Sequence, residues 1–316
     1  MGNVHDVEAQ IQRKPKDAQL LHAAETGDEE QLRLLLRDTT IQVDFANSSA
    51  LTPLFLAAKE GYTNCVRALL KAGAKVDGVG EGSSVLTPIW VATYGGHTEC
   101  VSELINAGAN MNAKYPETPL YIATREGRAG CLRLLINAGS DVNVRNTQGQ
   151  TPLLVACREL HENCIELLLG TECDLDARDR AGYNILYYAC NSTPDGSIIL
   201  KMLLDAGMPV NGPCGTQGDL TPLHICAQRG KLENVRLLLL YGANASVRDS
   251  KGYTPQHKAA NNLACQQLLQ EHEGMVPLLQ HLCRWSIRGL LGPKRLKFIM
   301  DLPIPTTLQN FLLYCR

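Results

Sequence analysis

The sequence predicts an all-α protein built from repeated helix pairs. Three observations lead to this prediction. Thr-Pro returns at a near-constant interval, a glycine follows the Leu-rich runs at a near-constant distance from the Thr, and only 5% of the residues are aromatic. Few aromatic residues and many Leu and Ala favour packed helices over sheets. The 316 residues also exceed the ~250–300 at which a single globular core stops growing. Stacked repeats avoid this limit, because each repeat packs only against its neighbours.

Eight repeat starts divide most of the chain. Thr-Pro begins six of the repeats, while Ala18-Gln19 and Asn184-Ile185 are degenerate copies. The spacing averages about 34 residues, close to the period of known helical repeats. The starts are residues 18, 52, 87, 118, 151, 184, 221 and 254.

Each repeat is expected to contain the same elements in the same order. Pro suits the first helical position because its missing N–H would be unpaired there, and the preceding Thr can cap the helix. A Leu-rich second helix, as at 237–240, ends at a glycine such as Gly242 that can adopt a left-handed conformation. A finger of variable length then leads to the next Thr. Glu172 replaces the glycine in the repeat that starts at Thr151, so that helix must end differently or with some strain.

The repeat carries a recognisable signature. Thr221-Pro222-Leu223-His224-Ile225-Cys226-Ala227 resembles the T-P-L-H-x-A sequence of the ankyrin repeat. The resemblance implies an ankyrin solenoid over 18–272, after an N-terminal extension over 1–17. It would contain about eight helix-turn-helix repeats with β-hairpin fingers.

The cysteines follow the repeat. Four of them lie 13 residues after the Thr of their repeat and so share one position on the second helix: Cys65, Cys100, Cys131 and Cys164. Equivalent positions are separated by about one helix thickness, ~10 Å, which is beyond disulfide reach. We expect small buried apolar side chains. Cys157, His161 and Cys164 offer three zinc ligands, but the repeat explains His161 and Cys164, so we expect no metal and no cofactor.

A different pattern begins after residue 274. An apolar stripe at helical spacing covers one side of the first segment: Leu279, Leu282, Cys283, Ile287 and Leu290. The turn Leu302-Pro303-Ile304-Pro305 and a short apolar helix follow. About 40 residues cannot form an adequate core alone, so this module should pack against the repeats and a partner.

The segment 275–316 resembles a SOCS box, and an ankyrin array followed by this box is the arrangement of the ankyrin repeat and SOCS box family. The resemblance implies a three-helix box and a substrate receptor of a ubiquitin ligase. Leu279, Leu282, Cys283 and Ile287 would bind elongin B and elongin C. Leu302, Pro303, Ile304 and Pro305 would select cullin five with its RING protein. Leu278 departs from the small residue or Pro that the family prefers.

The substrate is expected on the side formed by the finger tips and the first helices. Lys59, Arg125 and Arg158 each precede a Glu, which predicts a solvated face of mixed charge. Trp90 and two tyrosines are the expected energetic anchors. The candidate substrate-binding residues are Lys59, Tyr94, Lys114, Tyr115, Arg125, Arg158, Arg178 and Arg229.

Composition limits the other classes of function. The 30 Lys and Arg nearly balance the 32 Asp and Glu, so charge does not indicate a nucleic acid or an anionic membrane as partner. The sequence has no signal peptide and no ~18-residue apolar span, which predicts a cytoplasmic protein with reduced thiols and leaves the nucleus open. No catalytic arrangement stands outside the repeats, so we expect a non-catalytic adaptor. The alternative is an ankyrin scaffold or inhibitor that recruits no ligase.

Overall fold

The computed structural model describes residues 16–78, 86–113, 117–192, 196–215, 218–260 and 262–272. These residues form helices and turns with no strand, which confirms the predicted all-α class. The chain divides after Asp141 into two compact units. We call the described residues up to Asp141 unit 1 and those from Val142 onward unit 2. Within the described ranges, every helix is too short or too polar to cross a membrane.

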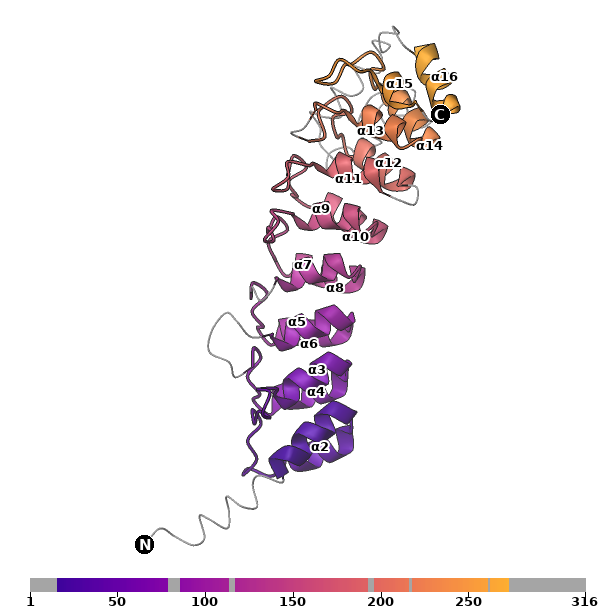
Figure 1. The fold of residues 1–316 in the computed structure, drawn as a ribbon. Helices are drawn as coiled ribbons and strands as arrows, with labels where there is room; N and C mark the ends of the chain where they lie inside the picture. The colour runs from indigo at the N-terminus through magenta and orange to yellow at the C-terminus, as the bar shows by residue number, and fades with distance from the viewer. Residues whose placement is uncertain are drawn as a thin grey trace, which may run out of the picture. The chain divides into compact units, whose positions relative to one another are not determined.

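Unit 1 consists of stacked helix pairs (Figure 1). Residues 16–26 are also helical and precede α2. The first helices α3, α5 and α7 pack against one another in turn, and so do the second helices α2, α4, α6 and α8. The helices are α2 (Glu29–Leu35), α3 (Pro53–Glu60), α4 (Thr63–Lys71), α5 (Pro88–Gly95), α6 (Thr98–Asn106), α7 (Pro119–Arg125) and α8 (Ala129–Asn137).

Unit 2 repeats this arrangement in two rows. The first helices α9, α11, α13 and α15 pack in chain order, and the second helices α10, α12, α14 and α16 form the other row. The helices are α9 (Pro152–Arg158), α10 (Glu162–Leu169), α11 (Ile185–Asn191), α12 (Ser197–Asp205), α13 (Pro222–Gln228), α14 (Leu232–Leu240), α15 (Pro255–Lys258) and α16 (Leu263–His272).

The predicted Thr caps are present. Thr52 is extended, and its hydroxyl accepts a hydrogen bond from the Phe55 amide at 3.2 Å, with Pro53 at the first helical position. The same bond recurs at the starts of α5, α7 and α9. In α13 the cap is a box in which the Thr221 amide donates to the His224 ring at 3.3 Å. The Thr-Pro pattern therefore fixes where each of these first helices begins.

The fingers are tight turns. Within the described residues only an isolated bridge, between Arg178 and Asn184, has β pairing, so the predicted β-hairpins contain no named strands there. Four of the tips are closed by a backbone hydrogen bond from one residue to the carbonyl four residues later, such as Asn146 N to Gln150 O at 3.1 Å.

Two helix ends depart from the repeat. At Glu172 the predicted difference is confirmed: α10 ends at Leu169, the Thr171 hydroxyl donates to the Leu168 carbonyl at 2.6 Å, and Glu172 does not adopt the left-handed conformation of Gly73, Gly108 and Gly139. Leu160 has φ +62° at the end of α9, where the neighbouring repeat has Gly127 at φ +67°. A left-handed Leu is strained, and the sequence analysis did not identify this position.

The stacked cysteines lie in the core, as predicted. Cys65, Cys100, Cys131 and Cys164 are at most 1% exposed, and all four are free thiols. Burial raises the pKa of the Cys164 thiol to about 11 and raises the pKa of the other three. These side chains are therefore neutral packing groups at physiological pH.

Candidate functional site

The structure tests only part of the predicted site. All residues predicted to bind elongin or cullin lie between 279 and 305, outside the described residues, as do Lys114 and Tyr115 of the predicted substrate face. Their roles stay predictions. The other candidates lie on the ends of the first helices and on the fingers, and we call this surface the inner face of each unit.

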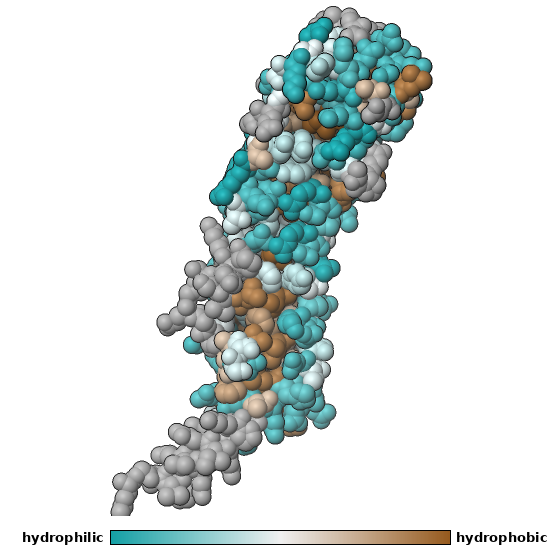
Figure 2. Space-filling view, viewed as in Figure 1, coloured by the Kyte–Doolittle hydropathy of each residue, from teal (hydrophilic) through white to brown (hydrophobic). Residues whose placement is uncertain are grey.

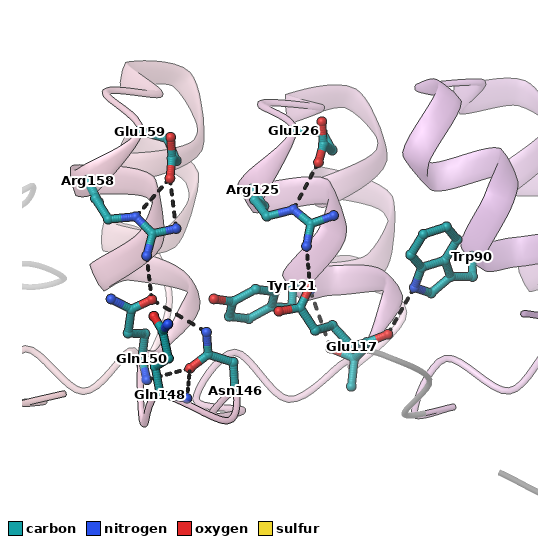
Figure 3. Close-up of polar contacts among 11 residues, drawn as sticks. Trp90, Glu117, Tyr121, Arg125, Glu126, Asn146, Gln148, Gln150, Arg158 and Glu159 are labelled. Carbon is teal, nitrogen blue, oxygen red and sulfur yellow. Dashed lines mark hydrogen bonds and ion pairs between the residues drawn. The ribbon is translucent and has the colours of Figure 1, made fainter. Parts of the chain in front are cut away.

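The inner face of unit 1 is centred on two aromatic residues of α5. Trp90 is half-buried, and its indole N–H donates to the Glu117 carbonyl at 3.0 Å (Figure 3). Tyr94, one helical turn later, is 49% exposed and stacks on Trp90 with 5.6 Å between ring centroids and 5° between the planes. The hydrogen bond and the stack fix both rings before any partner arrives.

Unit 1 has further half-buried apolar residues on its first helices and fingers. Leu51 and Leu86, each directly before the Thr of its repeat, are half-buried. Figure 2 shows apolar residues gathered on the surface of unit 1 near α3 and α5, bordered by hydrophilic ones. An exposed apolar patch of this kind is typical of a protein-binding site.

Charged clusters lie on the helices at either side of α5. At the end of α3, Lys59 pairs with Glu60 at 2.8 Å. The hydrogen-bonded carboxylate of Glu60, and more weakly that of Glu25, raises the pKa of the Lys59 ammonium. The Lys59 ammonium is therefore paired with the neighbouring carboxylate of its own helix.

The second cluster lies at the end of α7 (Figure 3). Arg125 forms ion pairs with Glu117 at 2.5 Å and with Glu126 at 2.9 Å. Arg125 therefore bridges two carboxylates. Lys59 and Arg125, both predicted to bind substrate, are therefore engaged in ion pairs within unit 1.

In unit 2, the inner face is occupied by a polar network. Arg158 donates a hydrogen bond to the side-chain amide oxygen of Gln150 and forms an ion pair with Glu159, both at 2.7 Å (Figure 3). The Gln150 amide donates to the Tyr188 hydroxyl at 3.1 Å, and that hydroxyl donates to Asp179 at 2.5 Å. Burial and the Asp179 carboxylate raise the pKa of Tyr188 to about 12.

Arginines brace the fingers of unit 2. Arg178, a predicted substrate residue, donates to the carbonyls of Gly182 at 2.8 Å and Pro213 at 3.0 Å. Arg145 and Arg248 likewise each donate to the backbone carbonyl of the glycine four residues later. Among the described part of the chain, exposed Arg229 forms no hydrogen bond or ion pair, so of these candidates it alone presents an uncommitted cation.

Sequence reasoning missed the residues that shape the finger tips. The side chain of Asn146 accepts hydrogen bonds from the amides of Gln148 and Gln150, both at 2.9 Å. The side chains of Asn47 and Asp249 accept hydrogen bonds from the amides two and four residues later in the same way. Asp179 accepts a hydrogen bond from the amide four residues later. The sequence contains a signal for these turns, because each of the four Asn and Asp residues lies five residues before the Thr or Asn that starts its repeat.

Comparison with known families identifies this architecture. The ankyrin repeat model matches residues 3–79, 78–146, 129–214 and 196–279, and the SOCS box model matches residues 275–313. The chain therefore belongs to the ankyrin repeat family, whose repeats form protein-binding solenoids. Within that family, it is one of the ankyrin repeat and SOCS box proteins.

Relatives agree with this assignment. Mouse ankyrin repeat and SOCS box protein 5 is 40% identical over 94 residues, which cover 30% of this chain and 29% of that protein. Human ankyrin repeat and SOCS box protein 11 is 37% identical over 115 residues, covering 36% of this chain and 34% of that protein. These alignments thus span about a third of the relatives' length.

A solved structure supports the fold. The crystal structure of the human ASB11 ankyrin repeat domain aligns with a TM-score of 0.50 at 26% identity. The alignment covers 81% of this chain and 97% of that domain. The predicted ankyrin solenoid is confirmed.

Proposed function

We propose that the protein is the substrate-recognition subunit of an elongin B/C–cullin five–RING ubiquitin ligase. The observation that carries the proposal is the SOCS box match at 275–313 directly after the ankyrin repeats. The names of the relatives, which combine the same two modules, support it. The repeats would hold the target, and the box would join it to the ligase for proteasomal degradation.

The chain itself would supply geometry and no chemical step. A bound substrate lysine experiences a high effective concentration of the ubiquitin thioester on the recruited conjugating enzyme. No acid, base or nucleophile of this chain is required. The rigidly capped helix pairs suit this task, because they hold the inner faces in fixed positions within each unit.

Elongin binding would use the stripe at Leu279, Leu282, Cys283 and Ile287. Apolar residues at this spacing form one side of a helix, and such a helix can insert into a groove. Cullin five would be selected by the turn at Leu302–Pro305.

The first experiment is co-purification of elongin B and C with the full chain. We expect both to bind the wild type and to be lost from the double variant Leu279→Ala with Cys283→Ala. Replacing a buried anchor of this kind with alanine weakens the binding free energy by ~2 kcal/mol or more. Gln280→Ala with Arg284→Ala is the matched control, since it shifts the pair of substitutions by one residue, off the stripe.

The results separate the two candidate functions. Elongin binding retained by the Leu279 and Cys283 variant would refute the site assignment. A wild type that binds no elongin would favour the ankyrin scaffold or inhibitor. Replacing Leu302 and Pro305 with Ala should leave elongin bound and remove cullin five, which tests the cullin assignment by itself.

A further inference from the structure

We propose that a groove between α12 and α14 of unit 2 is a binding site for an amphipathic helix of a partner protein, with carboxylates beside the apolar stripe of that helix. The groove has a volume of about 370 Å³, is open to solvent and lies on the surface of the second helices, which we call the outer face. The two helices pack against each other in their row (Figure 1). The groove includes none of the residues predicted to bind substrate, elongin or cullin, so the inference goes beyond the proposed function and does not depend on it.

Two aliphatic side chains of the groove are exposed although the repeat does not require them. Ile198 is 56% exposed and Leu240 is 55% exposed, and half-buried Leu237 lies with them in the groove. Ile198 is the second residue of α12, and Leu240 is the ninth residue of α14. Helix pairs fold without apolar groups at these positions, so the two side chains are available to a partner. Three other nine-residue second helices have polar residues or glycine there: Asn64 and Lys71 in α4, Glu99 and Asn106 in α6, and Gly130 and Asn137 in α8.

Basic side chains border the apolar part of the groove. Lys201 on α12 is exposed and forms no hydrogen bond or ion pair with any residue that the structure describes. Among the same residues, Arg236 pairs only with Glu233, at 3.6 Å, and the two side chains are 59% and 70% exposed. A long and exposed pair contributes little, so the Arg236 guanidinium is free to bind a partner's carboxylate. Asp205, the acidic residue of α12, accepts a hydrogen bond from the Tyr241 hydroxyl at 2.6 Å and does not line the groove.

The charge of this border distinguishes between possible occupants. The chain's own C-terminal segment, residues 275–316, has six Lys and Arg against one Asp, so it is basic like the groove. A second copy that bound through the same groove would bring Lys201 and Arg236 close to the same two cations of its partner. An acidic segment of a different protein is the complementary occupant.

The form of the groove favours a helix as the bound element. The axes of packed helices such as α12 and α14 lie ~8–10 Å apart, which leaves room for a third helix laid over both. Ile198 lies near the start of α12 and Leu240 at the end of α14, and their positions differ by seven residues, or ~10 Å along the helix axis. A partner helix with aliphatic residues at i, i+4 and i+7 has a stripe of that length, and a carboxylate beside the stripe can reach Lys201 or Arg236.

The test is a differential selection on the full chain with a phage library of random peptides of ~16 residues, long enough for a short helix. The library is first depleted on the double variant Ile198→Asn with Leu240→Asn, which has at these positions the residues of α4 and α6, and is then enriched on the wild type. We expect the enriched peptides to combine aliphatic residues at helical spacing with an excess of Asp and Glu. A synthetic peptide of the enriched sequence should bind the double variant about thirtyfold more weakly in fluorescence anisotropy, as expected when buried anchors are lost.

Charge reversal tests the basic border. Lys201→Glu with Arg236→Glu should weaken binding of the same peptide about tenfold. The matched control is Arg133→Glu, because Arg133 is exposed at the fifth position of α8, as Lys201 is in α12. Leu34→Asn is the apolar control, because Leu34 is 54% exposed on α2 of unit 1. Both controls should leave the affinity unchanged.

Several results would overturn the proposal. These are enrichment of no peptide, or an unchanged affinity after charge reversal with thermal unfolding also unchanged. Enrichment of basic peptides would instead assign the groove to a segment such as residues 275–316. A wild type that is dimeric in size-exclusion chromatography, and monomeric after Ile198→Asn with Leu240→Asn, would assign it to a second copy. Elongin takes no part in the selection, so these results leave the ligase function untouched, and a wild type that binds no elongin refutes that function alone.

Discussion

The inner faces of the two units differ in what their side chains contact. In unit 1, Trp90 and Tyr94 stack on each other, and Tyr94 is half exposed to solvent, on the helix between those that carry the Lys59 and Arg125 ion pairs. In unit 2, side chains of the inner face bind one another, as in the chain from Arg158 through Gln150 and Tyr188 to Asp179.

The difference teaches that a residue's register in a repeat does not decide its role. Arg125 and Arg158 occupy equivalent positions, and each donates to the residue before the Thr of its own repeat. What separates them is the charge of that acceptor. We infer that unit 1 is built for recognition and that the inner face of unit 2 contributes mainly to stability.

The largest expected contrast in stability is between Tyr188 and Tyr94. Tyr188→Ala removes a half-buried ring and leaves Asp179 and Gln150 without their shared partner, so unfolding should become easier by ~2 kcal/mol. Tyr94→Ala should change the free energy of unfolding by less than ~0.5 kcal/mol, because that side chain is largely on the surface. Urea denaturation followed by circular dichroism measures both.

Tyr188→Phe keeps the ring and removes only the hydroxyl, so its effect should be smaller, ~1 kcal/mol. If Tyr94→Ala destabilised the protein as much as Tyr188→Ala, the division between a recognition face and a stabilising face would be wrong.

The second prediction extends the comparison to the second helices. In unit 1 the position 13 residues after the Thr is a buried cysteine, but in α14 it is Asn234, which is fully buried. Its polar neighbour is the Cys226 thiol, a weak partner, and neither amide atom has a hydrogen bond of normal geometry among the described residues. Asn234→Cys should therefore raise the free energy of unfolding by ~1–2 kcal/mol.

Cys131→Asn makes the reverse change in unit 1 and should destabilise by a similar amount. The same urea denaturation serves for both variants. A neutral Asn234→Cys would show that the buried amide is satisfied in solution, for example by water.

The sequence was sufficient to predict the helices because their signals are local. Thr52-Pro53 and its equivalents determine where a first helix begins, and the register of Cys65 correctly predicted burial. The pairing of side chains was not predictable in the same way. Whether Arg125 faces solvent or Glu117 depends on how the finger folds back over the helix end, and one repeat's sequence does not contain that geometry.

Strain was also missed, although Leu160 stands where five of the other repeats have glycine. Repeat alignment reveals the substitution, but only the backbone shows that the left-handed turn persists. The His161 amide still donates to the Ala156 carbonyl at 2.9 Å, as the Arg128 amide does to Ala123 in unit 1 at 2.7 Å. The hydrogen bond is kept, and the Cβ of Leu160 is forced into an unfavourable conformation.

The smallest expected effect follows from this pair of turns. Leu160→Gly should stabilise unit 2 by ~1 kcal/mol, because glycine adopts φ +62° without the Cβ penalty. Gly127→Leu should destabilise unit 1 by ~1–2 kcal/mol for the opposite reason. Thermal unfolding by calorimetry measures both shifts.

Leu160→Ala distinguishes backbone strain from side-chain packing as the cause of the stabilisation expected for Leu160→Gly. Alanine removes the same side chain beyond Cβ but keeps the atom that clashes, so it should give none of the gain seen with glycine. Equal stabilisation by alanine and glycine would instead mean that the half-buried leucine side chain is what costs stability. The two units would then differ at this turn in packing, and the strain attributed to the left-handed Leu160 would contribute little.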